Sequence, residues 1–349
     1  MRLEPKPATT SAGLFLYPAG AIGATLVFAS LLVLVAGASP FNVFWLVLKG
    51  AAGSQFAIVE TLTRATPLIF TGLAVAVAFR AKLWNIGAEA QLYIGAVVTV
   101  VLGTGAVALP SLALIPLIMV CAMLAGALLL LGPAVLKTRF GVDEVVTTLM
   151  LNFVILLFVS YLLEGPLKDP MGLGWPQSKR VVADAQLPRL IQGKRLHFGF
   201  AIALASAAIV WVIMKKTVLG YEMRAVGHNP EAARFSGISV NLVLVKTALL
   251  SGGLAALAGF SEVAGLKGNL TLDLSPGYGY TGIVVAMLAV LNPLGVVASA
   301  IFVAGIFVGA DSMSRLAGVP SYIAEVMVAT ALLTMVVAIM LTRYRIRWR

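Results

Sequence analysis

A series of long apolar runs limits what this chain can fold into. The first runs from Leu14 to Ala36, and comparable runs recur to the end of the sequence. A helix needs roughly 20 apolar residues to cross a bilayer, and the alternating ten-residue pattern of a membrane β-barrel is not seen. Charged residues make up only 11% of the sequence, whereas soluble domains carry about 25%. We therefore predict an all-α polytopic membrane protein with one transmembrane domain over residues 1–349.

About ten of these apolar runs are interpreted as membrane spans. We expect them at about residues 14–37, 58–79, 92–105, 112–135, 143–163, 198–215, 240–261, 281–291, 296–311 and 322–341. Residues 39–50 are too few to span, but Phe41, Phe44 and Trp45 favour a helix at the membrane interface. Residues 165–197 form the longest polar loop.

The basic residues predict how these spans are oriented. Fourteen Lys and Arg residues fall on the side of the two termini, and four fall on the opposite side outside the 165–197 loop. Cytoplasmic segments of membrane proteins are enriched in Lys and Arg. We therefore expect cytoplasmic termini and an extracytoplasmic loop at 165–197. The net charge of +11 does not indicate a nucleic-acid partner, because the basic residues lie mostly at span ends, and the expected partner is membrane lipid.

One polar stretch, residues 220–238, lies between two apolar runs on the cytoplasmic side. Asn229 suits an N-cap, Pro230 the first helical position, and Gly237 a left-handed C-terminal cap. The stretch therefore predicts a cytoplasmic loop containing a short helix of about two turns. It is either an ordinary surface loop or a docking element, in which the small side chains of Ala232–Ala233 let the helix enter a groove of another protein.

The sequence does not indicate an enzyme. It lacks the Gly-x-x-x-x-Gly-Lys-Ser/Thr loop that cradles ATP phosphates. Its single cysteine, Cys121, excludes an intrachain disulfide, and His197 and His228 do not form a metal-binding pair. Few acidic residues lie inside the expected spans, where an ion-driven transporter binds its coupling ion. We therefore predict no catalytic residue, metal or cofactor in this chain, and an energy source on a partner.

Polar residues near a Gly-rich break are candidates for a substrate path. Asn85, Glu89 and Gln91 cluster in this break, and Asn152 lies in the expected span 143–163. Structural alternatives exist for two of them. Asn85 would cap the following helix, and Asn152 would form an interhelical hydrogen bond.

A second break, residues 265–280, suggests an internal repeat. Spans 2–5 contain the first break after their first helix, and spans 7–10 contain the second break after theirs. In the expected topology the two breaks face opposite sides, as in an inverted-topology repeat. Tyr278 and Tyr280 in this break would either stack on a flat substrate ring or belong to an interfacial aromatic belt.

Three motifs resemble those of permease subunits of bacterial ABC importers for simple sugars and nucleosides. The first is Trp84-Asn-Ile-Gly-Ala-Glu-Ala-Gln91, with Ala90 where the family commonly has Gly. The second is Gly220-Tyr-x-x-Arg-Ala-x-Gly-x-Asn-x-x-Ala-Ala-x-x-x-Gly-Ile238. The third is Ser275-Pro-Gly-Tyr-Gly-Tyr-Thr-Gly-Ile283, followed by Asn292-Pro-Leu-Gly295. The first block is of the kind seen in the nucleoside branch, and the resemblance covers the chain from about residue 55 onward.

This resemblance implies a type II-like ABC importer permease of the bacterial inner membrane. It implies a second permease subunit, often a different chain, together with cytoplasmic ABC ATPase subunits and an extracytoplasmic substrate-binding protein. ATP and Mg would be bound by the ATPase. The residues implied in coupling to that ATPase are Asn229, Pro230, Glu231, Ala232, Ala233, Arg234, Phe235 and Gly237.

The function implied by the resemblance is import of nucleosides, or of a related simple sugar, by alternating access. Two other classes of function remain as alternatives. A self-contained secondary transporter would move substrate on an ion gradient without partners. A membrane scaffold or receptor would show no substrate-dependent ATPase activity when combined with the partners.

Overall fold

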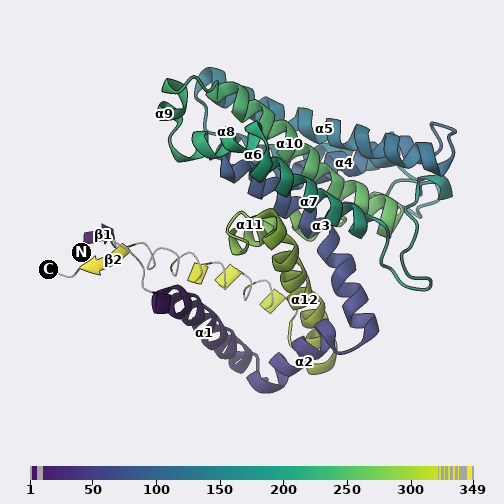
Figure 1. Ribbon diagram of the computed structural model, residues 1–349. Helices are drawn as coiled ribbons and strands as arrows, with labels where there is room; N and C mark the ends of the chain where they lie inside the picture. Colours follow the sequence, from purple (N-terminus) through teal and green to yellow (C-terminus); the bar gives the residue numbers. More distant parts are fainter. Residues whose placement is uncertain are drawn as a thin grey trace. The chain divides into compact units, whose positions relative to one another are not determined.

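The computed structural model describes residues 2–5, 11–320 and 344–347, with isolated residues between 322 and 337. The chain forms two compact units, residues 62–301 and residues 1–61 with 302–349. Helices α3 (Gln55–Arg80) and α12 (Pro293–Ala317) contribute to both. Figure 1 shows the all-helical architecture predicted from the apolar runs, apart from one pair of short strands.

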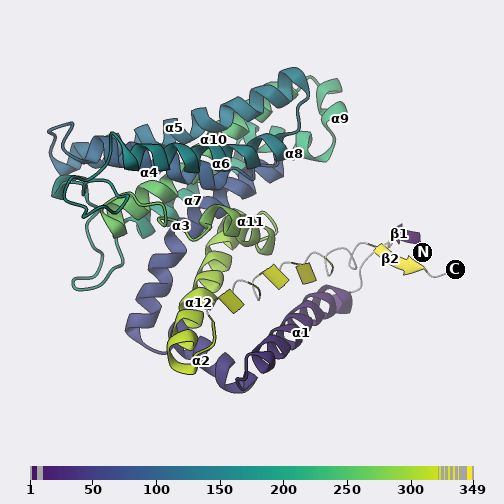
Figure 2. The same cartoon turned by 180° about the vertical axis from the view of Figure 1, so that it is seen from behind.

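The larger unit is a helical bundle with α10 at its centre. Its further elements are α4 (Ala88–Gly103), α5 (Ser111–Phe140), α6 (Glu144–Glu164), the 3₁₀ helix η1 (Ala183–Ala185), α7 (Gly199–Lys216), α8 (Val218–His228), α9 (Pro230–Phe235), α10 (Val240–Ser261), the π-helix η2 (Glu262–Lys267) and α11 (Tyr278–Leu288). Helix α10 packs along α5 and α4, and Figures 1 and 2 both show α5 and α10 side by side. The apolar window of α10 with η2 is 72% buried, whereas that of α6 is 22% buried. Helix α10 therefore forms core, and α6 presents most of its apolar surface outward.

Glycines allow the central helices to touch along their backbones. A Cβ atom at Gly252 of α10 would overlap the carbonyl oxygen of Gly126 on α5. One at Gly259 would overlap the carbonyl oxygen of Leu92 on α4. Small residues at helix contacts are the usual means of close packing in membranes, where apolar burial cannot distinguish protein from lipid.

The smaller unit contains α1 (Ser11–Val35), α2 (Pro40–Ala52), the start of α3 and the end of α12. Helix α2 confirms the helix expected at 39–50, with Phe41 and Trp45 exposed. Strands β1 (Arg2–Pro5) and β2 (Tyr344–Arg347) pair in antiparallel register. This pairing brings residues 2–5 and 344–347 together.

Six helices of the described chain are long and apolar enough to cross a membrane. They are α3, α5, α6, α7, α10 with η2, and α12. The pair Gly23–Val35 and Pro40–Ala52, bent by 110°, would make a seventh if counted as one span. Helices α4 and α11 are shorter apolar helices that coincide with expected spans, so this length criterion supports six or seven spans among the described residues, compared with the ten predicted. The last expected span, 322–341, falls largely outside the described residues.

One helix, α8, lies where a polar loop was expected. The Oγ1 atom of Thr217 caps it by accepting a hydrogen bond from the Gly220 N–H at 3.2 Å. Met223 and Val226 on its inner face are buried. The helix over residues 220–228 of the predicted 220–238 loop was not anticipated, because their polar composition hid an amphipathic pattern.

Candidate functional site

A polar stripe on α6 holds the Trp84–Gln91 motif in place. Glu144, Thr148 and Asn152 follow at four-residue intervals on one helix face. Their side-chain oxygens accept hydrogen bonds from the backbone N–H groups of positions 84, 86 and 90 at 3.2, 3.2 and 2.9 Å. Backbone that is not helical needs such partners inside a membrane protein, because lipid offers none. The stripe therefore maintains the break between α3 and α4.

Asn85 and Gln91 form a reciprocal amide pair within this motif. Each side chain donates to the other at 2.9 Å, and both residues are fully buried. Asn85 Nδ2 also donates to Ser251 Oγ on α10 at 3.0 Å. The residue at the N-cap of α4 is Gly87, not Asn85 as the capping alternative required. Asn85 Oδ1 instead accepts the Gly87 N–H at 3.0 Å.

The Asn152 side chain joins α6 to α11, which confirms the predicted interhelical hydrogen bond. Its Nδ2 atom contacts the hydroxyl of Tyr280 at 3.0 Å and donates to the Ile86 carbonyl at the same distance. Tyr278 is 6% exposed, so it does not belong to an interfacial belt. Tyr280 is 39% exposed. Of the six candidate path residues, it alone presents substantial surface.

The first turns of α4 and α11 meet at Glu89 and Gly279. The Gly279 N–H donates to Glu89 Oε2 at 2.6 Å, and a Cβ at Gly279 would overlap the Glu89 backbone nitrogen. The Tyr93 hydroxyl donates to the Leu272 carbonyl at 2.6 Å, which fixes the segment before α11. The two short helices thus begin at one point inside the unit.

Sequence reasoning missed three members of this network. Ser251 bridges Asn85 and the Ala74 carbonyl, to which it donates at 2.7 Å. Ser275 Oγ accepts the Tyr278 N–H at 2.9 Å at the start of α11. Glu144 had a signal in the four-residue spacing of the α6 stripe, and Ser275 had one as the first residue of the third motif, whereas Ser251 had none.

Helix α9 has the caps predicted for it. Asn229 Oδ1 accepts hydrogen bonds from the N–H groups of Glu231 and Ala232 at 3.0 and 3.1 Å. Gly237 has φ +86°, the left-handed conformation expected of the C-terminal cap. The structure corrects one expectation, because Ala233 is only 4% exposed and faces inward, whereas Ala232 is exposed. Phe235 is 96% exposed and projects from the end of α9.

Helix α8 connects α9 to the end of α3. A Cβ at Gly227 would overlap the Arg80 carbonyl oxygen, so the backbones of α8 and α3 are in contact. The Arg224 guanidinium donates to the Met214 carbonyl near the end of α7. Because Arg80 immediately precedes the turn into the Trp84–Gln91 motif, α9 and the buried polar network are linked by one continuous set of contacts.

The 165–197 loop covers the far end of α10. The N–H groups of Ser178, Val181 and Leu187 donate to carbonyls in the 264–270 segment at 2.8 to 2.9 Å. His197 is fully buried, its Nδ1 accepts the Gly199 N–H at 3.2 Å, and its ring lies against Gly265. Burial lowers the pKa of His197 to about 4, so the imidazole is neutral at pH 7.

Comparison with known proteins places the chain among transport permeases. Residues 57–341 match the family described as "branched-chain amino acid transport system / permease component". The glucose ABC transporter permease protein TsgB13 of Haloferax volcanii is 35% identical over 99% of this chain and 93% of its own. The guanosine ABC transporter permease protein NupP of Bacillus subtilis is 36% identical over 91% of this chain and 92% of its own.

A third relative, the nucleoside ABC transporter permease protein NupB of Lactococcus lactis, is 32% identical over 80% of this chain and 79% of its own. No solved structure matches the chain. The match to the family over most of the sequence, and relatives above 30% identity along nearly their whole length, agree with the resemblance carried by the three motifs. The chain belongs to the branched-chain-type permease family and is a permease subunit of an ABC transporter.

Proposed function

We propose that this permease subunit imports nucleosides across the bacterial inner membrane by alternating access. Two of the relatives above are named for guanosine and nucleoside transport, which supports this substrate class. Its energy comes from a cytoplasmic ABC ATPase that binds ATP and Mg. Its other partners are a second permease subunit, which is a different chain, and an extracytoplasmic substrate-binding protein.

Coupling to the ATPase takes place through α9. The observation that carries this assignment is a short capped helix with an exposed small side chain, Ala232, beside the almost fully exposed ring of Phe235. The Phe235 side chain is 96% exposed, so in the isolated subunit its ring packs against almost no other residue. Insertion into a groove of the ATPase would cover it, with Asn229, Pro230, Glu231, Arg234 and Gly237 forming the rest of the contact.

Substitution of Ala232 tests this coupling. We expect Ala232→Glu to abolish substrate-stimulated ATP hydrolysis in the reconstituted complex without lowering the melting temperature of the subunit. Ala232→Ser, which keeps the side chain small, should retain stimulation. Ala233→Glu cannot serve as the test, because a buried carboxylate there would unfold α9. Normal stimulation in Ala232→Glu would rule out docking through α9.

We further propose that the substrate contacts Tyr280, while Asn85, Glu89, Gln91, Asn152 and Tyr278 position it. The partly exposed ring of Tyr280 supports this division, since the other five side chains are buried. Stacking of a base on an aromatic ring contributes about 1–3 kcal/mol. Tyr280→Phe keeps the ring and loses only the contact with Asn152, so it should transport nucleosides, whereas Tyr280→Ala should not. Equal guanosine uptake by these two variants would remove Tyr280 from the path.

A simple sugar is the second candidate substrate, favoured by the glucose permease that covers nearly the whole chain. Uptake of labelled guanosine and labelled glucose into proteoliposomes containing the complete complex and its binding protein separates the two. A secondary transporter would instead take up substrate as the purified chain alone, driven by a proton or sodium gradient.

For the membrane topology we propose ten spans, cytoplasmic termini and an inverted repeat of spans 2–5 and 7–10. Helices α4 and α11 support the repeat: both are short, and both follow a longer helix and a break. Their first turns touch at Glu89 and Gly279, where an axis relating the two halves would pass.

A further inference from the structure

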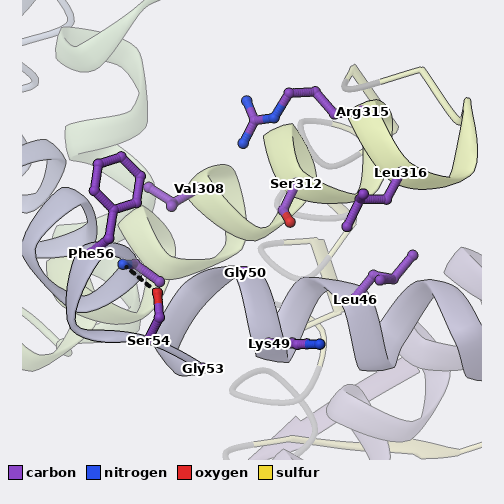
Figure 3. Close-up of a pocket in the computed structure, with 11 residues that line it drawn as sticks. Leu46, Lys49, Gly50, Gly53, Ser54, Phe56, Val308, Ser312, Arg315 and Leu316 are labelled. Atoms are coloured by element: carbon purple, nitrogen blue, oxygen red, sulfur yellow. Dashed lines mark hydrogen bonds between the residues drawn. The ribbon is translucent and has the colours of Figure 1, made fainter.

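A pocket in the smaller unit, between α2 and α12, is lined by two cationic side chains. Its cavity volume is about 200 Å³. Figure 3 shows Arg315 on α12 and Lys49 on α2 at opposite edges, with Ser312 between them. The remaining walls are mainly apolar and include Leu46, Phe56 and Leu316.

The two cations of the pocket lie at helix ends. Lys49 lies in the last turn of α2 and Arg315 in the last turn of α12, and both are exposed. Within the described part of the chain, neither side chain forms a hydrogen bond or an ion pair, and no acidic residue lines the pocket. An anion bound in the pocket would be attracted by both positive charges.

Further groups at the pocket favour negative charge. Helix α3 begins beside it, with Ser54 Oγ accepting the Ala57 N–H at 3.1 Å (Figure 3). The N-terminal end of a helix carries partial positive charge. The hydroxyl of Ser312 adds a hydrogen-bond donor, and the Arg315 guanidinium matches the geometry of a phosphate.

The apolar part of the lining distinguishes a lipid from a small soluble anion. Phe56 is 60% exposed and Leu316 69% exposed, on the same pocket as the cations. Arg315 ends a helix apolar enough to span a membrane, so the cations lie at the level where phospholipid headgroups meet acyl chains. A Cβ at Gly309 would overlap the Val47 carbonyl, so the contact between α2 and α12 is tight and the pocket is preformed.

We propose that this pocket binds an anionic phospholipid, with the headgroup phosphate between Lys49 and Arg315 and an acyl chain along Phe56 and Leu316. The bound lipid would fix α2 against α12. This site is separate from the buried polar network and from α9, and it does not depend on which substrate is transported.

Lipid binding to the purified full-length chain tests the proposal. Native mass spectrometry in detergent would count bound lipid after addition of phosphatidylglycerol, phosphatidylcholine with the same acyl chains, or inorganic phosphate. Of these three additions, we expect only phosphatidylglycerol to bind, with one lipid molecule per chain. The double variant Lys49→Gln/Arg315→Gln should lower its affinity by about tenfold or more, because it removes both positive charges that attract the phosphate.

Two matched variants keep the result interpretable. Lys216→Gln removes an exposed lysine in the last turn of α7 and should leave lipid binding unchanged. Lys49→Arg keeps the charge and should also bind normally. Equal retention of phosphatidylglycerol by the double variant would overturn the site. Binding of phosphate as tight as that of phosphatidylglycerol would make it a soluble-anion site, and equal binding of phosphatidylcholine would remove the role of charge.

Discussion

At the scale of single residues, the most constrained pair is Asn85 with Gln91. Both amides are fully buried, and each satisfies the other through two hydrogen bonds of 2.9 Å. Removing one partner leaves the other amide without its hydrogen bonds in a site that water cannot reach. A buried polar group left unsatisfied in this way costs about 1–3 kcal/mol.

Gln91→Ala should therefore destabilise the subunit by about 1–3 kcal/mol. The melting temperature of the purified chain in detergent would report the loss. Gln55→Ala removes an exposed glutamine at the start of α3 and is the matched control. An equal effect of the two substitutions would contradict a structural role for the amide pair.

His197 gives the 165–197 loop a pH-dependent stability. Burial lowers the pKa of His197 from 6.5 to about 4. Between pH 4 and pH 6.5 the imidazole therefore binds a proton in the unfolded loop but not in the folded loop. Stability is therefore complete above pH 6.5 and falls as the pH drops toward 4, by about 2 kcal/mol at pH 5. Hydrogen exchange of residues 165–197 at pH 7.5 and pH 5, corrected for intrinsic rates, would measure it. His197→Gln, which cannot titrate, should flatten the dependence.

At the scale of elements, α8 links α9 to the interior of the larger unit. Gly227 of α8 contacts the Arg80 carbonyl at the end of α3 directly. A displacement of α9 that moves α8 therefore also displaces the end of α3. An added methyl group at that position must push the two helices apart, and overpacking of this kind costs about 1–3 kcal/mol.

We expect Gly227→Ala to keep basal ATP hydrolysis in the assembled complex but to lower substrate uptake per ATP hydrolysed. Gly132→Ala on α5 is the control, because a Cβ there meets no atom within 4 Å. Comparison of uptake and hydrolysis in the same proteoliposomes checks this. An unchanged ratio in Gly227→Ala would show that α8 does not transmit the movement.

The elements also show how far sequence reasoning extends. Caps are local chemistry, so Asn229 and Gly237 could be assigned correctly from the chain alone. The inward direction of Ala233 could not, because the same short helix allows either alanine to face the protein. Asn85 was expected as a cap, but its partner Gln91 lies one helical turn inside α4 and satisfies its amide there. Long-range partners such as Ser251 depend on how helices pack, which no local pattern encodes.

At the scale of the whole molecule, charge distribution predicts which loops face the cytoplasm. The test is single-cysteine labelling on a Cys121→Ser background, in which the sole native thiol is removed. Ser236→Cys beside α9 should react with a membrane-impermeant reagent only in inside-out vesicles, and Lys179→Cys only in intact cells. Both positions are exposed. The reverse labelling pattern would invert the proposed topology.

The backbone contacts among α4, α5 and α10 restrict how such a molecule can change shape. Where carbonyl groups touch glycines, as at Gly252 and Gly259, helices cannot slide or rotate without collision. Packed contacts of this kind favour movement as a rigid body. We therefore expect these three helices to move together as one rigid body. Opening to one side or the other has to occur along its edges, where neighbouring helices meet it through side chains rather than through backbone.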